Sequence, residues 1–475
     1  MRFTCQRRLS ISMALILGAC TLPAQLPNTR TAMSAADLHI KTESSIVVSD
    51  SWWTLYNEPQ LDALVNEALQ ANPKLEILLE NVHAARAMEG LETGGLKPSI
   101  GVDVNSQRDR FSEFYIYPPP YGGSVFWNST AAIGAGWSPD LYGLQRAKVN
   151  AAAKQAVSLE YRYRSAKTVL VSGLVIQLLE LDNVEQSKQL VKSSMQLLDD
   201  KINLMKKRER AGLDNTSTLI ELDSARQGWS VRLNELESAE QKLRHGIAIM
   251  LGRNPNDAAT INIKLNDRLM PSLPTELSAD LLLRRADLKA ARAQIESNEF
   301  KKQASKAAFY PNINLTALAG YQSLSLQHFL TAPARTLGFG PDISLPLYDA
   351  GRLNFAYLAS HSELNLAIAE YNETVLNALK DVADDIHDLK KLEAQVNLTD
   401  AQLKDAEQLL NQYRHREAQG LISHMPVLDA QMAFNRAQWE ALSAKTQLAQ
   451  QKVSLLVALG GPPESLLHSH PEVVP

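Results

Sequence analysis

The stretch "AFYPNINLTALAGYQ" (308–322) decides the fold, because it interrupts a helix-rich chain with a short alternating segment. From Ile313 to Tyr321 the odd-numbered residues are apolar or aromatic, and the even-numbered ones, apart from Leu318, are Asn, Thr or Gly. Alternation with a period of two predicts a strand with one apolar and one polar face. Pro311, which precedes the alternation, predicts the end of a helix at this point.

The same pattern occurs earlier in the chain, because the sequence contains an internal duplication. Residues 72–104 align without gaps on residues 285–317, and this alignment places Pro98 on Pro311. Internal repeats indicate that a structural unit is itself repeated. We therefore expect a first structural repeat at 51–252 and a second at 281–460. A linker at 253–280 joins them, and a tail at 461–475 follows.

Four strands are expected, at about 98–110, 124–138, 311–323 and 336–347. Alternating strands of about ten residues, with Tyr and Trp near their ends, are typical of a wall that faces lipid. A soluble antiparallel sheet with one buried face is the alternative. The predicted lipid-facing residues lie on the apolar faces of these strands: Ile100, Val102, Trp127, Ile313, Leu315 and Phe339.

Four strands are too few to close a membrane barrel, whose smallest form has about eight. An open sheet edge in lipid would leave backbone groups without hydrogen-bond partners. The barrel must therefore be shared between chains, with eight strands from two copies or twelve from three. Because side chains fill an eight-stranded interior, a conduit favours three or more copies.

Long helices are expected at about 146–211, 214–251, 352–419 and 424–459. From Tyr357 onward, apolar residues recur with alternating spacings of four and three, which is the heptad pattern of a coiled coil. The segment between Arg352 and Gly420 contains no Pro or Gly, so one helix could run for about 100 Å at 1.5 Å per residue. A fibrous or scaffolding coiled coil is the alternative interpretation of these helices.

The N-terminus has the features of a secretory signal, since arginines precede an apolar run that is too short to span a bilayer. Its end, Leu17-Gly18-Ala19-Cys20, resembles a bacterial lipobox. We expect residues 1–19 to be removed, Cys20 to be lipidated, and residues 20–50 to form a linker. An ordinary cleaved signal with an incidental cysteine is the alternative.

Composition and motifs exclude several function classes. The chain has 475 residues, of which 45% are apolar, and its formal charge of −4 argues against a nucleic-acid partner. No serine-hydrolase elbow, zincin motif, P-loop or dinucleotide fingerprint occurs. No pair of histidines has the spacing of a metal site on an expected helix face. We therefore expect no catalytic residue, no cofactor and no metal site.

At the family level, the chain resembles the TolC-like outer-membrane efflux proteins, and within them the lipid-anchored NodT-type branch. The resemblance rests on the lipobox cysteine and on four stretches: "SWWTLYNEPQLDALVNEALQANPKLE" (51–76), "LLLRRADLKAARAQI" (281–295), "AFYPNINL" (308–315) and "LPLYDAGRL" (345–353). One departure is Ala286, where the family usually has Pro in a turn. This difference concerns the local turn and not the fold.

The resemblance implies a mainly α-helical chain with a membrane β-barrel, in which tandem helical hairpins and four strands per chain form a 12-stranded barrel in a homotrimer. It places the barrel in the outer membrane, in contact with its lipid, and a helical tunnel in the periplasm. The implied partners are a periplasmic adaptor, or membrane fusion protein, and an inner-membrane pump. The resistance-nodulation-division type is one candidate class of pump.

The resemblance also implies functional residues at the hairpin turns and near the pore. The turns that contain Gly212, Leu213, Gly420 and Leu421 are similar to the family's adaptor-docking motif, although any helical hairpin favours Gly at its turn. Asp429 falls where the family has an aspartate at the narrowest point of the closed pore, although an acid in a first helical turn is favoured by the helix dipole alone. Its possible partners, by position along the chain, are Arg414, His415 and Arg416.

The predicted function is that of the outer-membrane channel of a tripartite efflux system, which passes small molecules from a pump and adaptor to the outside. A periplasmic coiled-coil adaptor or scaffold lipoprotein is the main alternative, and a soluble binding lipoprotein is the third. An adaptor would normally carry one helical hairpin, whereas here both the hairpin and the strand pair are duplicated.

Overall fold

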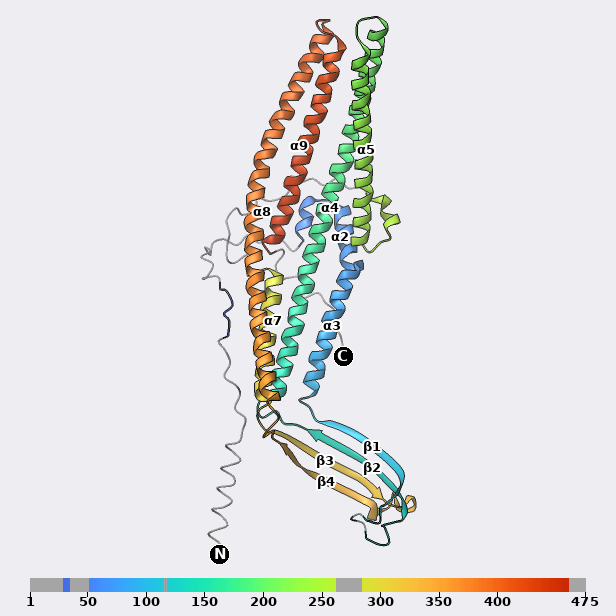
Figure 1. Ribbon diagram of the computed structural model, residues 1–475, viewed down its shortest axis with the longest axis vertical. Coiled ribbons are helices and arrows are strands. Elements are labelled where there is room, and N and C mark those ends of the chain that lie inside the picture. The colour runs from blue at the N-terminus through green and yellow to red at the C-terminus, as the bar shows by residue number, and fades with distance from the viewer. Residues whose placement is uncertain (1–28, 35–50, 115, 117, 262–283, 461–475) are drawn as a thin grey trace. The chain divides into compact units, whose positions relative to one another are not determined.

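The computed structural model describes residues 29–34, 51–261 apart from 115 and 117, and 284–460 (Figure 1). It contains four strands, four long helices, three shorter α-helices and short 3-10 turns. The strands are β1 (Ser99–Arg110), β2 (Val125–Trp137), β3 (Asn312–Ser323) and β4 (Arg335–Ser344). The helices are α2 (Pro59–Ala71), α3 (Pro73–Gly94), α4 (Leu144–Arg210), α5 (Thr216–Met250), α7 (Ala286–Ala307), α8 (Arg352–Ala418) and α9 (His424–Ala458).

The mainly helical fold with four antiparallel strands is confirmed. The two halves of the chain carry helices of equal length, since α4 and α8 have 67 residues each and α5 and α9 have 35 each. The strand bounds differ most at β4, which ends at Ser344 and not near 347. Ser344 pairs with Asn312. Just beyond this pair each strand reaches a proline, Pro311 or Pro346, which has no amide hydrogen to donate to a ladder.

Two compact units are present. Of the described residues, the first comprises 29–32, 81–159 and 290–371, and it contains the sheet. Of the same described residues, the second comprises 33–34, 51–80, 160–261, 284–289 and 372–460, and it contains α5, α9 and most of α4 and α8.

In the first unit the strands form one antiparallel sheet in the order β1-β2-β3-β4 (Figure 1). Gly320 of β3 lies very close to β2, because a Cβ added to it would be 2.2 Å from the carbonyl oxygen of Ala131. No other residue type fits this approach without a backbone shift. Gly338 of β4 lies on the same face of the sheet, and a Cβ there would have no atom within 4 Å.

The parts of α4 and α7 that belong to the first unit pack closely through small side chains. The hydroxyl of Ser158 in α4 donates to the carbonyl oxygen of Ala290, and that of Ser297 in α7 donates to the carbonyl oxygen of Ala151, both at 2.8 Å. Both serines are buried. These reciprocal bonds satisfy the buried hydroxyls and fix the register of the two helices.

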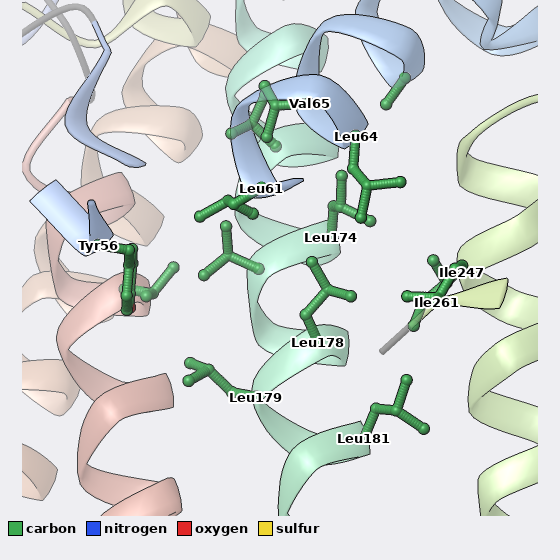
Figure 2. Close-up of a cluster of buried hydrophobic side chains, with 14 of the residues drawn as sticks. Tyr56, Leu61, Leu64, Val65, Leu174, Leu178, Leu179, Leu181, Ile247 and Ile261 are labelled. Carbon is green, nitrogen blue, oxygen red and sulfur yellow. The ribbon is translucent and has the colours of Figure 1, made fainter. Parts of the chain in front are cut away.

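The main core of the second unit forms around α2 (Figure 2). Leu61 and Val65 of α2 are fully buried, and they belong to one apolar cluster with Leu174 and Leu178 of α4. Residues of α5 and α9, among them Ile247 and Val453, complete this cluster. The short helix thus joins three long helices, and burial of a leucine or valine side chain contributes about 1.5–3 kcal/mol.

A partly buried ionic network also ties α4 to α5. Glu240 of α5 pairs with Lys188 of α4 and with Arg244, which in turn contacts Glu185 of α4 at 2.5 Å. Burial by itself would raise the pKa of Glu240, but the hydrogen bonds from Lys188 and Arg244 outweigh it and hold that pKa below its usual value. Burial raises the pKa of Glu185. The two carboxylates therefore have opposite shifts within one network.

The glycine contact in the sheet leads to a matched pair of substitutions. Gly320→Ala is expected to destabilise the protein by about 1–3 kcal/mol, because the added methyl group overlaps the β2 backbone. Gly338→Ala adds the same methyl group on the same face in open space, and it should leave stability unchanged. Thermal unfolding of the purified proteins in detergent measures both effects. Equal melting temperatures for the two variants would contradict the close approach of β2 and β3.

Candidate functional site

The strand register brings the apolar faces of all four strands into one surface, which we call the apolar face. Ile100, Ala135, Ala317 and Phe339 lie side by side across the sheet, one from each strand. The next such row is Val102, Ile133, Ala319 and Leu337. The six residues predicted to face lipid all belong to this face: Ile100, Val102, Trp127, Ile313, Leu315 and Phe339.

The apolar face is exposed in the chain. Ile100 is 76% exposed and Phe339 is 94% exposed, and Val102 and Leu337 are comparably open. A soluble antiparallel sheet buries its apolar face against a core, whereas large exposed apolar patches mark surfaces that contact other proteins or lipid. Within the described residues this face therefore has the character of a contact surface.

The opposite face of the sheet, which we call the polar face, carries hydrogen-bonding side chains. Asp109 accepts hydrogen bonds from Gln107 Nε2 at 3.0 Å and from Asn128 Nδ2 at 3.3 Å. Asp103 and Asp342 lie on the same face. A sheet with one apolar and one polar, acidic face is suited to separate a hydrocarbon phase from water.

Aromatic residues lie near the sheet end from which the helices continue. The rings of Tyr142 and Tyr310 stack with centroids 4.9 Å apart and planes 8° from parallel. Trp137, on the apolar face, donates from Nε1 to the carbonyl oxygen of Leu96 at 3.1 Å. Tyr and Trp are enriched where membrane meets water, so this end of the apolar face resembles an interfacial belt.

Both helical hairpins turn with the same backbone geometry. Gly212 and Gly420 have φ angles of 69° and 70°. The amide of Leu213 donates to the carbonyl of Arg208 at 2.9 Å, and that of Leu421 donates to the carbonyl of Arg416 at 2.9 Å. These are the bonds of a Schellman motif, in which the residue with positive φ is best supplied by glycine.

The hairpin turns also present apolar side chains to the surroundings. Leu213 and Leu421 are each 67% exposed. A Cβ at Gly212 or at Gly420 would have no atom within 4 Å, so the turn backbone itself is accessible. Each tip thus combines open backbone with one exposed leucine, a surface on which a partner could pack.

Asp429 is the sixth residue of α9, beyond the first turn in which the helix dipole would favour an acid, and it pairs with Lys201 of α4. Its side chain is 55% exposed, whereas that of Lys201 is only 19% exposed. Arg414, one of the partners suggested by the sequence, instead donates to Gln431 at 2.5 Å. Within this chain the charge of Asp429 is therefore balanced by a lysine of the other hairpin.

Sequence reasoning missed Lys201, which is 228 residues away from Asp429 along the chain. A heptad pattern shows which face of α4 is apolar, but not which of its residues lies opposite a given residue of α9. That match depends on the axial register of two helices from different repeats.

The remaining expectations concern the lipidated cysteine, metal sites and membrane-spanning helices. Cys20 and the tail at 461–475 lie outside the described residues. Only 29–34 of the N-terminal linker and 253–261 of the inter-repeat linker are described. Among the described residues, no group of three His, Cys, Asp or Glu side chains could hold a metal ion. None of the described helices combines the length and the apolar character needed to cross a bilayer.

Comparison with known proteins shows the family. A model described as outer membrane efflux protein matches residues 64–249 and 277–461, which is one match in each half of the chain. The chain belongs to the outer membrane efflux protein family. The sequence resemblance to TolC-like outer-membrane efflux proteins is thereby confirmed.

Relatives of this efflux protein align along almost its whole length. The multidrug resistance outer membrane protein MdtQ of Escherichia coli is 28% identical over 467 residues, which covers 94% of this chain and 96% of that protein. The probable efflux pump outer membrane protein TtgC of Pseudomonas putida is 24% identical over 455 residues, covering 94% of each.

Solved structures share the fold. The outer membrane protein VceC of Vibrio cholerae has a TM-score of 0.78 and 26% identity, and the alignment covers 88% of this chain and 100% of that one. The CmeC outer membrane channel of Campylobacter jejuni has a TM-score of 0.80 at 19% identity, over 94% and 96% of the two chains.

Family membership decides between the function classes that the sequence left open. An outer membrane efflux protein is a transport component and not an enzyme. The adaptor and scaffold alternative is not supported, because the efflux-protein model matches both repeats. The protein is an outer-membrane channel component of an efflux system.

Proposed function

We propose that three copies of this chain form a continuous export duct with a 12-stranded barrel in the outer membrane and a helical tunnel in the periplasm. The single observation that carries the proposal is the exposed apolar face of a four-stranded sheet whose outer strands are β1 and β4. In lipid these edges need partners. Three copies supply twelve strands, enough to leave a lumen.

The polar face of the sheet then lines the lumen, and the apolar face contacts lipid. Small molecules pass through this duct from an inner-membrane pump and a periplasmic adaptor, with the resistance-nodulation-division type as the candidate class of pump. The names of the relatives, which include a multidrug resistance protein and a toluene efflux protein, support a cargo of small organic compounds. Diacylglycerol on Cys20 anchors the chain to the membrane in this proposal.

The two faces are tested by one substitution on each. Phe339→Arg is expected to impair outer-membrane assembly by about 2–4 kcal/mol, the usual penalty for an arginine facing lipid near the midplane. Thr316→Arg is the control, because Thr316 pairs with Gly340, next to Phe339, and belongs to the polar face. Assembly is measured as the amount of trimer in isolated outer membranes. Normal assembly of the Phe339 variant would overturn the barrel.

We propose that the two hairpin tips are the surface that docks the adaptor. Gly212 and Gly420 allow close approach of another backbone, and Leu213 and Leu421 supply apolar contacts that are otherwise exposed. The Schellman bonds make each tip rigid, so little conformational entropy is lost on binding.

Substitution of both leucines tests this docking surface. Leu213→Asp with Leu421→Asp should abolish efflux while the amount of trimer in the outer membrane stays unchanged, because a charge cannot enter an apolar contact without a partner. Leu213→Met with Leu421→Met keeps the apolar bulk and should retain efflux. Drug susceptibility of a strain that depends on this channel reports the result. Full efflux by the aspartate pair would rule out these leucines as docking contacts.

We propose that Asp429 forms the constriction of the periplasmic entrance and that Lys201 keeps it closed. Three copies of Asp429 near one axis would repel each other, and three lysines would neutralise them. The pairing of Asp429 with Lys201, from α9 and α4, supports a link between the two hairpins of a subunit.

Opposite substitutions separate the two charges of this pair. Asp429→Ala should raise single-channel conductance in planar bilayers and lower cation preference, since the carboxylate ring is lost. Lys201→Met should also raise conductance, because the hairpins are no longer tied, but it should increase cation preference. Lys206→Met removes a nearby lysine of the same helix as the control. Unchanged conductance in both variants would remove the pair from the gate.

A further inference from the structure

Charged side chains of the sheet are sorted by face. The strands contain three aspartates, Asp103, Asp109 and Asp342, and all three lie on the polar face. They also contain three arginines, and all three lie on the apolar face: Arg108, Arg110 and Arg335. Arginines on a surface that faces lipid carry a free-energy cost, so their presence there calls for a compensating interaction.

Two of these arginines stand directly opposite an aromatic residue. Arg108 of β1 pairs with Trp127 of β2, and Arg335 of β4 pairs with Tyr321 of β3. Both pairs lie toward the strand ends that lead into the loops between β1 and β2 and between β3 and β4. The helices continue from the opposite ends of the strands.

The internal duplication makes the two pairs equivalent. Arg108 is the tenth residue after Pro98, and Tyr321 is the tenth residue after Pro311, the proline that aligns with Pro98. Each repeat therefore has one arginine opposite one aromatic residue at the same position of its strand pair. The arginine is on the first strand of the pair in the first repeat and on the second strand in the second repeat. Both repeats thus place an arginine–aromatic pair at the same distance from the helical end of the sheet.

The two guanidinium groups are available for a ligand. Arg108 and Arg335 are exposed, and among the described residues neither side chain has a hydrogen bond or an ion pair. Arg110 differs, because its guanidinium binds Glu113 at 3.2 Å. The sheet thus offers two unpaired cations and one that is already neutralised.

We propose that the Arg108–Trp127 and Arg335–Tyr321 pairs bind phosphate groups of lipopolysaccharide in the outer leaflet. This inference rests on the proposed barrel, which places the loop ends of the strands at the outer surface. Trp and Tyr favour the headgroup level of a membrane. The planar guanidinium of arginine matches phosphate geometry, and each such cation near an anionic surface strengthens binding about fivefold. A trimer would carry six such pairs in a belt.

Titration of the purified full-length trimer in detergent with fluorescent lipopolysaccharide tests this proposal. Arg108→Gln combined with Arg335→Gln removes the arginine of every pair and should weaken binding about fivefold, the effect of one arginine per site. Arg110→Gln removes the same charge from the same face, but from a side chain already paired with Glu113, and it should leave the affinity unchanged. Unaltered binding by the double variant, or an equal loss in the Arg110 variant, would overturn the proposal.

A second binding experiment uses the wild-type trimer alone and changes the lipid. The wild-type trimer should bind lipopolysaccharide from which the phosphates have been removed far more weakly than the intact lipid, and equal binding would refute phosphate recognition. Failure of the wild-type protein to assemble in the outer membrane would instead overturn the barrel itself. Assembly of the wild type with binding that is independent of phosphate and of both arginines would refute this inference alone.

Discussion

The rest of the structure depends on the unsatisfied backbone groups at the edges of a four-stranded sheet. In hydrocarbon each such group costs several kcal/mol, and the chain has two edge strands, β1 and β4, on which they are exposed. No local change in side chains removes this cost. In the proposed trimer the cost is relieved because β1 of one copy pairs with β4 of the next, so that the oligomer and the barrel form together. The exposed apolar face follows from the same requirement.

Duplication gives the chain two hairpins of each kind, and it preserves backbone geometry more closely than side-chain chemistry. The turns at Gly212 and Gly420 have the same hydrogen bonds and nearly the same φ. One flanking side-chain contact is kept, since Glu209 accepts from Thr216 at 3.0 Å and Glu417 lies 2.6 Å from His424 at the same positions. The ion pair of Arg208 with Asp214 occurs in the first turn and has no counterpart in the second, where Ile422 stands in place of the aspartate. Backbone shape is what the fold requires at both places, and side chains are free to diverge toward separate contacts.

Most of the fold could be predicted from the sequence because its signals are local. Alternation around Ile313 shows both faces of β3, and Pro311 together with its aligned Pro98 marks where the strand pairs begin. Gly420 marks a hairpin turn because positive φ favours glycine. The contacts that could not be predicted join segments distant in sequence, such as Lys201 with Asp429. They depend on the register between elements, which no local pattern contains.

Leu318, the one residue that broke the alternation of β3, can be understood from its neighbours across the sheet. It lies on the polar face between Gly134 of β2 and Gly338 of β4. Glycines on both sides leave the backbone of those strands bare and weaken pairing, because they offer no side chain to pack. Gly101 of β1 continues this row, so Leu318 is the only residue in it with a side chain. A Cβ built on Gly134 or on Gly338 would have no atom of Leu318 within 4 Å, so the leucine does not cover the neighbouring strands. The apolar side chain therefore breaks the alternation at a place where it displaces no polar contact, in a row that is otherwise bare backbone.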